Sequence, residues 1–61
     1  MKLTMKEWRR AKGYSISRLA NELDVSFSTI MRWEENVEKM PIGKVIEACS
    51  IYGINIEDVS I

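Results

Sequence analysis

The hydrophobic residues of this 61-residue chain recur every three or four positions, which is the spacing of one face of an α-helix. Four stripes follow this spacing: Met5, Trp8 and Ala11; Ile16, Leu19, Ala20 and Leu23; Ile30 and Trp33; Val45, Ile46, Cys49 and Tyr52. The stretch Ile54-Asn55-Ile56 alternates with period two, but three residues are too few to require a strand. With a brief last segment at residues 55–59, the pattern predicts a compact all-α fold of five short helices.

Residues that favour helix ends stand at the borders of these segments. Thr4 and Glu7 have the spacing of a capping box, in which each side chain accepts a hydrogen bond from the other residue's N–H. Helix N-caps are expected at Ser15 and Ser26, a helix start just after Pro41, and a capped turn at Asn55. Gly13, Asp24 and Asn36 are expected to end helices in the left-handed conformation, and Gly53 is expected to stop the fourth helix.

Length and composition limit the chain to one domain, residues 1–61, and restrict its chemistry. The single cysteine, Cys49, has no partner for an internal disulfide, and without histidine the chain lacks the ligands for a zinc site. Cys49 is expected to be a small buried residue. No set of nucleophile, base and orienting group can be assembled, so we expect no enzyme, no cofactor, no metal and no small-molecule ligand. No apolar run suits a signal peptide or a membrane span, which makes the cytoplasm the expected compartment.

Charge is segregated along the chain although its net value is zero. Residues 1–32 carry seven basic and three acidic side chains, a local charge of +4, and residues 33–61 carry two basic and six acidic ones, a local charge of −4. The basic half can present a positive face to phosphate. The same segregation also arises by chance on a solvated surface, so charge alone does not decide the function.

Two consecutive capped segments, joined by Asp24-Val25-Ser26, have the parts of a helix-turn-helix at about residues 15–35. In that motif the second helix enters the major groove of DNA and the first crosses the backbone. Hydroxyl side chains stand where the helix starts would approach phosphate oxygens: Ser15, Ser17, Ser26, Ser28 and Thr29. Val25 is expected to pack beneath the turn.

The wider pattern resembles the Cro/repressor (XRE) type of helix-turn-helix protein found in phage, prophage and bacterial regulators. The resemblance covers roughly residues 3–60 and is carried by Trp8 to Ser15, Leu19-Ala20, Val25-Ser26, Ser28-Thr29-Ile30, Trp33-Glu34 and Pro41. It implies that Phe27, Ser28 and Arg32 face base edges, that Ser15 and Lys39 contact phosphate, and that Ile16 stands where relatives have a DNA-contacting glutamine. It also implies a structural pair between Arg9 and Glu34.

The residues themselves leave alternatives open at several of these positions. Arg32 can donate two hydrogen bonds to guanine, or it can be a solvated surface arginine. Phe27 can cover a thymine methyl or pack onto the core, Ile16 favours the core, and Met31 can pack partly against the fourth helix. Trp8 and Trp33 are expected in the core rather than stacked on bases. Lys6, Arg10, Lys12 and Arg18 are candidate phosphate partners or solvated charges.

A short recognition helix reads only a few base pairs, so a dimer on two half-sites is expected. The apolar tail is the candidate homodimer surface: Ile51, Tyr52, Ile54, Ile56, Val59 and Ile61. The same tail can instead close the core. The leading hypothesis is a double-stranded DNA binder that regulates or represses transcription from a pseudo-palindromic operator. The alternative is a module of the same fold that binds a protein, such as a toxin or a polymerase subunit, which the acidic second half favours.

Overall fold

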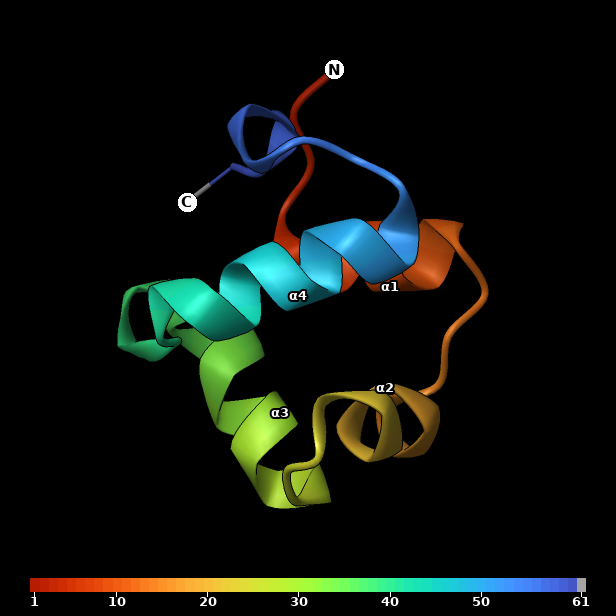
Figure 1. Ribbon diagram of the computed structural model, residues 1–61, viewed down its shortest axis with the longest axis vertical. Coiled ribbons are helices and arrows are strands. Elements are labelled where there is room, and N and C mark those ends of the chain that lie inside the picture. Colours follow the sequence, from red (N-terminus) through yellow and green to blue (C-terminus); the bar gives the residue numbers. More distant parts are fainter. Residues whose placement is uncertain (61) are drawn as a thin grey trace.

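Four α-helices and two 3-10 turns make up residues 1–60, the part of the chain that the computed structural model describes (Figure 1). The α-helices are α1 (Met5–Ala11), α2 (Ile16–Leu23), α3 (Phe27–Glu35) and α4 (Ile42–Tyr52), and the turns are η1 (Val37–Lys39) and η2 (Ile56–Asp58). The all-α class is confirmed. Among the described residues, none of these helices has the length and apolar character needed to cross a bilayer.

The expected fifth helix is wrong, because the last segment forms only the three-residue turn η2. Two backbone hydrogen bonds join Leu3 to the residues on either side of Val59: the Leu3 N–H donates to the Asp58 carbonyl at 3.2 Å, and the Leu3 carbonyl accepts from the Ser60 N–H at 2.8 Å. Val59 thereby forms a parallel bridge with Leu3 and has extended backbone. The Asp58 carbonyl and the Ser60 N–H, which a longer helix would need for its own hydrogen bonds, are thus bonded to Leu3.

Most of the predicted helix ends are confirmed. The Thr4 N–H donates to the Glu7 carboxylate at 2.8 Å, and the Glu7 N–H donates to the Thr4 hydroxyl at 3.2 Å. Gly13, Asp24 and Gly53 have φ angles of 76°, 57° and 70°. The Asn55 N–H donates to the Asp58 carboxylate, as expected for a capped turn.

Asn36 is the exception, since its φ angle of −147° is not left-handed. Its N–H donates to the carbonyl oxygens of Arg32 and Trp33, and its own carbonyl accepts from the Lys39 N–H at 3.0 Å. Asn36 therefore both ends α3 and starts η1, and the chain passes into the next turn without the reversal that a left-handed residue gives.

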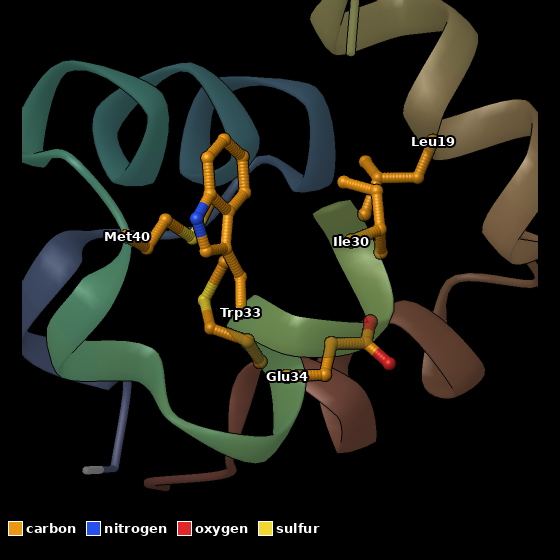
Figure 2. Close-up of a pocket in the computed structure, with 6 residues that line it drawn as sticks. Leu19, Ile30, Trp33, Glu34 and Met40 are labelled. Atoms are coloured by element: carbon orange, nitrogen blue, oxygen red, sulfur yellow. The ribbon is translucent and has the colours of Figure 1, made fainter. Parts of the chain in front are cut away.

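The inner face of α3 is formed by Ile30 and Trp33, which lie beside Leu19 of α2 and Met40 after η1 (Figure 2). These four residues, with Met5 and Glu34, line a void of only about 10 Å³. A void of that size is near the lower limit for one water molecule, so the helices meet in close packing.

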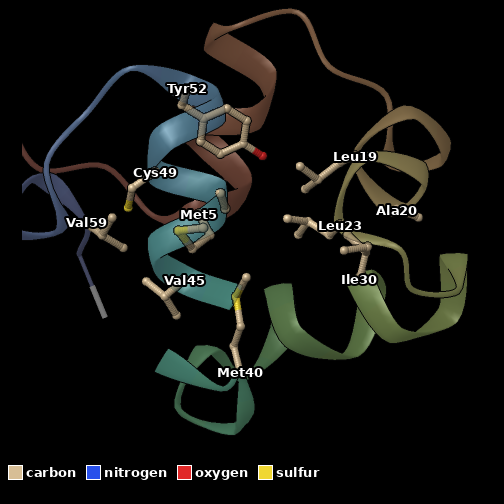
Figure 3. Close-up of a cluster of buried hydrophobic side chains, with 11 residues drawn as sticks. Met5, Leu19, Ala20, Leu23, Ile30, Met40, Val45, Cys49, Tyr52 and Val59 are labelled. Carbon is tan, nitrogen blue, oxygen red and sulfur yellow. The ribbon is translucent and has the colours of Figure 1, made fainter. Parts of the chain in front are cut away.

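The core joins all four helices (Figure 3). Its buried members are Met5, Leu19, Ala20, Leu23, Ile30, Met40, Val45, Ala48, Cys49, Tyr52 and Val59. Cys49 is buried as expected, and burial raises the pKa of its thiol. Trp8 and Trp33 pack against this core but are only partly buried. Val25 also packs against it from the turn, as expected.

Two positions of the expected apolar stripes are wrong. Ile46 is 56% exposed, and Ala48 takes the buried position on α4. In α1, Ala11 of the expected stripe is exposed, while the charged Arg9 is buried. Arg9 is tolerated there because Glu34 pairs with it.

Candidate nucleic-acid interface

Helices α2 and α3 pack against each other and meet at a tight turn, where Asp24 is left-handed with φ 57° and ψ 47°. The Val25 N–H donates back to the Ala20 carbonyl at 3.0 Å, and Val25 is half-buried beneath the turn. This anchoring fixes the direction in which α3 leaves the turn. The helix-turn-helix geometry expected at about residues 15–35 is therefore present.

Serine hydroxyls cap both helices at their N-termini. The Ser15 hydroxyl accepts from the Arg18 N–H at 3.0 Å, and the Ser26 hydroxyl accepts from the Thr29 N–H at 3.2 Å. Helix geometry leaves the N–H groups of the first two residues of each helix without an intrahelical acceptor. Together with the positive end of the helix dipole, these groups make each N-terminus able to hold a phosphate oxygen.

The hydroxyl residues differ in how free they are to contact a ligand. Ser17 and Ser28 are exposed, whereas Thr29 is half-buried. The Ser26 hydroxyl lies 2.8 Å from the Thr29 hydroxyl and 3.3 Å from the Ser28 hydroxyl. Ser26 is thus the centre of a small hydroxyl cluster that stabilises the first turn of α3.

The outer face of α3 carries the residues expected to read bases. Phe27 is 48% exposed, and Ser28 and Arg32 are exposed as well. Met31, for which the sequence leaves partial packing against the fourth helix open, is 45% exposed and belongs to this outer face. Its position four residues after Phe27 is the signal that identifies it, because residues i and i+4 lie on one helix face.

Ile16 is half-buried and packs against the core, which agrees with the core assignment favoured for it. It also lines a hollow of about 240 Å³ whose other walls are Lys6, Met31, Glu34 and Glu35. Ile16 and Met31 therefore face the same hollow, which lies between the start of α2 and α3.

Arg9 and Glu34 form the expected structural pair, which links α1 to α3. The Arg9 Nε donates to one carboxylate oxygen of Glu34 at 2.7 Å and Nη2 donates to the other at 3.2 Å. Each side chain is only 8% exposed. Arg9 Nη1 also donates to the Tyr14 carbonyl at 2.9 Å, so the guanidinium holds the loop that leads into α2.

Four basic residues of the first half, the candidate phosphate partners or solvated charges, are all exposed: Lys6, Arg10, Lys12 and Arg18. Two of them lie over aromatic rings: the Lys12 ammonium lies 5.8 Å from the centre of the Trp8 ring, and the Arg18 guanidinium lies 4.2 Å from the centre of the Tyr14 ring. The stacking of Arg18 holds a positive charge within the first turn of α2. Lys39 is exposed in η1, next to the exposed Glu38 and close in sequence to Glu35.

One contact that supports the motif left no signal in the sequence. Lys44 of α4 donates from Nζ to the Leu23 carbonyl at 2.7 Å, and it also pairs with Glu47 at 3.3 Å. The Leu23 carbonyl belongs to the last turn of α2, just before Asp24. A cation there stabilises the negative end of the helix dipole and ties the motif to α4.

Comparison with known proteins agrees with this geometry. A helix-turn-helix family model matches residues 5–59, which is nearly the whole chain. No curated protein and no solved structure matches the chain. The extent of the family match and the two capped, tightly joined helices lead to one conclusion: the chain belongs to the helix-turn-helix family of DNA-binding regulators, of the Cro/repressor type that its motifs resemble.

Proposed function

We propose that the protein binds double-stranded DNA sequence-specifically and represses transcription as a homodimer on a pseudo-palindromic operator. The observation that carries this proposal is the outer face of α3, where Phe27, Ser28, Met31 and Arg32 stand exposed beyond a serine-capped N-terminus. An N-terminus of this kind, presented by a tightly packed partner helix, is how this motif enters the major groove.

The proposed contacts divide into two classes. Arg32 reads guanine by donating to O6 and N7, and Phe27 and Ser28 contact neighbouring base edges. The N-termini of α2 and α3 hold phosphate through Ser15, Ser17, Ser26 and Thr29, with Lys39 as a further phosphate partner, and Ile16 stands at the DNA-facing start of α2. The basic first half of the chain, with a charge of +4, supports this orientation toward DNA.

The proposed dimer surface differs from the apolar tail, because among the described residues of the tail only Ile56 is exposed. Tyr52 and Val59 are buried in the core, Ile51 and Ile54 pack against it, and Ile61 lies outside the described residues. Three isoleucines remain exposed on this side: Ile42 and Ile46 of α4 and Ile56 of η2. Exposed isoleucines one helical turn apart form the kind of apolar surface that a second copy can cover.

Selection of binding sites from a pool of random duplex DNA tests the proposal. We expect enrichment of a pseudo-palindrome whose half-sites lie about 10 base pairs apart, one helical turn of DNA. Salt-sensitive background without an enriched sequence would contradict sequence-specific binding.

A second candidate function is a protein-binding module, and one observation favours it. An apolar groove of about 240 Å³ lies beside the exposed isoleucines and is lined by Val37, Glu38, Met40, Ile42, Val45, Ile56 and Val59. The salt dependence of DNA affinity separates the two functions. Phosphate contacts release counterions and make affinity fall steeply with salt, whereas a module that binds protein gives little slope with DNA.

A further inference from the structure

The outer face of α3 contains an apolar line and a polar line that run side by side. Phe27 and Met31 are four residues apart, so their Cβ atoms lie about 5–6 Å from each other. Ser28 and Arg32 have the same spacing and are displaced by one residue, or about 100° around the helix. All four residues are exposed.

Met31 shares a hollow with Ile16 at the start of α2, and Lys6, Glu34 and Glu35 form the other walls of this hollow. Phe27 and Met31, with Ile16 across the hollow, are together called the methyl strip, which runs from the first turn of α3 to the first turn of α2. Both ends of the strip lie beside a serine-capped helix N-terminus. An apolar strip between two phosphate-binding helix ends is placed against the floor of the groove rather than against the DNA backbone.

The floor of the major groove offers one strongly apolar group, the C5-methyl of thymine. Every other base edge there presents hydrogen-bond donors or acceptors. If the methyl strip covered the O6 and N7 of guanine or the N6 and N7 of adenine, these groups would lose water without gaining a partner, and binding would weaken. The strip therefore favours thymine both by attraction to the methyl and by rejection of purine edges.

We propose that Phe27 and Met31 are specificity-determining residues that recognise thymine methyl groups, with Ile16 closing the strip at its far end. Each half-site then contains thymine beside the guanine that Arg32 contacts. This inference rests on the proposed DNA binding and names the bases that the site selects.

Replacement of thymine by uracil in the selected operator tests the inference, because it removes the methyl and leaves base pairing unchanged. At the thymines that the strip covers, we expect about four-fold weaker binding for each uracil, which corresponds to about 0.8 kcal/mol for one buried methyl-sized group. At other thymines, uracil has no effect. Equal affinity for uracil and thymine at every position would overturn the inference, while the enriched operator would still support DNA binding.

Variants then assign the effect to the strip. Phe27→Ala and Met31→Ala remove exposed side chains, so helical circular dichroism is expected to stay unchanged. Each variant should lose the uracil penalty at its own thymine, as expected for two groups in contact. Met31→Leu should keep the penalty because it retains the apolar volume.

Arg32→Ala is the matched control on the polar line of the same helix. It should weaken binding to the operator but keep the ratio between thymine and uracil affinities. A uracil penalty that persists in both Phe27→Ala and Met31→Ala would overturn the assignment. Failure to enrich any operator would instead contradict the proposed function itself.

Discussion

At the scale of single residues, the contacts proposed for Arg32 and Lys39 differ in kind, one specifying sequence and the other supplying affinity. Arg32 is exposed on this helix, whereas Lys39 lies in η1 after the helix has ended. A bidentate arginine discriminates between bases, but a lysine on phosphate attracts every sequence alike. Removing Arg32 and removing Lys39 should therefore have different effects on DNA affinity and on base preference.

We expect Arg32→Ala to cost about 1–3 kcal/mol on the selected operator and to relax the preference at one base position. Lys39→Ala should weaken all sequences about equally and reduce the slope of affinity against salt. Titration of the operator and of a scrambled duplex at several salt concentrations measures both effects. An unchanged preferred sequence in Arg32→Ala would show that the reading face is assigned to the wrong residue.

Tyr52 is a residue whose environment predicts a pH dependence. Its hydroxyl is buried with no hydrogen-bond partner among residues 1–60, and its ring meets that of Tyr14 edge to face at 5.6 Å. Burial, reinforced by the charge of Glu34, raises the pKa of Tyr52 above its ordinary value of 10.0. In the unfolded chain the same hydroxyl ionises near that ordinary value.

Because the folded protein holds this proton more tightly, the stability from Tyr52 is fully present below about pH 10 and is lost as the pH rises further. We expect Tyr52→Phe to remove this part of the alkaline loss. At neutral pH the variant should be as stable as the parent or slightly more so, since it deletes a buried hydroxyl without a partner. Urea unfolding of both proteins from pH 7 to pH 11 measures the difference, and a difference that does not vary with pH would contradict the assignment.

At the scale of elements, the buried pair of Arg9 and Glu34 fixes the recognition helix against α1. Arg9 is a charged residue in the buried stripe of its helix, and within residues 1–60 its partners are Glu34 and the Tyr14 carbonyl. Breaking such a pair leaves the remaining charge buried without its partner. Removing one partner therefore lowers the free energy of unfolding by more than the intact pair adds to it.

Glu34→Gln is expected to lower the free energy of unfolding by about 3–5 kcal/mol, because Arg9 stays buried and charged. The matched control is Glu35→Gln, an exposed neighbour that should change stability by less than about 0.5 kcal/mol. Replacing both partners, as in Arg9→Met with Glu34→Leu, should restore much of the loss. Urea unfolding followed by tryptophan fluorescence measures all three, and equal effects of the two Gln variants would show that the pair is not buried in solution.

At the scale of the whole molecule, the two halves of the sequence differ in net charge and in the residues that they expose. The serine-capped N-termini of α2 and α3 lie in the half that carries +4, while α4 and η2 belong to the half that carries −4 and expose Ile42, Ile46 and Ile56. These isoleucines lie outside the helix-turn-helix, so a second protein chain can cover them without competing with DNA for the outer face of α3. The proposed dimer uses this side of the molecule.

Ile46→Glu places a charge in the proposed dimer interface, so we expect it to shift the protein toward monomer and to weaken operator binding. Ile46 is exposed within one chain, and the fold of the monomer should survive. Ile46→Val keeps an apolar surface and serves as the conservative control. Sedimentation equilibrium measures the association, and the same oligomeric state in all three proteins would contradict this choice of interface.

The sequence by itself determined the local structure and much of the candidate site. Caps at Thr4, Ser15 and Ser26, and left-handed residues at Gly13, Asp24 and Gly53, act within a few residues of the chain, so their positions can be read directly. Together with helical periodicity they predict the four α-helices and the turn of the motif. The pairing of Arg9 with Glu34 followed from resemblance to a family, since nothing local links residues 25 positions apart.

Only the tertiary structure decided which apolar residues are covered and how the chain ends. Ile46 and Ile56 have the apolar side chains typical of core residues. They are nevertheless exposed, because no element within residues 1–60 packs over them. Lys44 reaches the end of α2, and Leu3 pairs with Val59, through contacts between residues far apart in sequence. Burial and long-range hydrogen bonds depend on where other elements lie in space, and a periodic pattern along one helix contains no information about its neighbours.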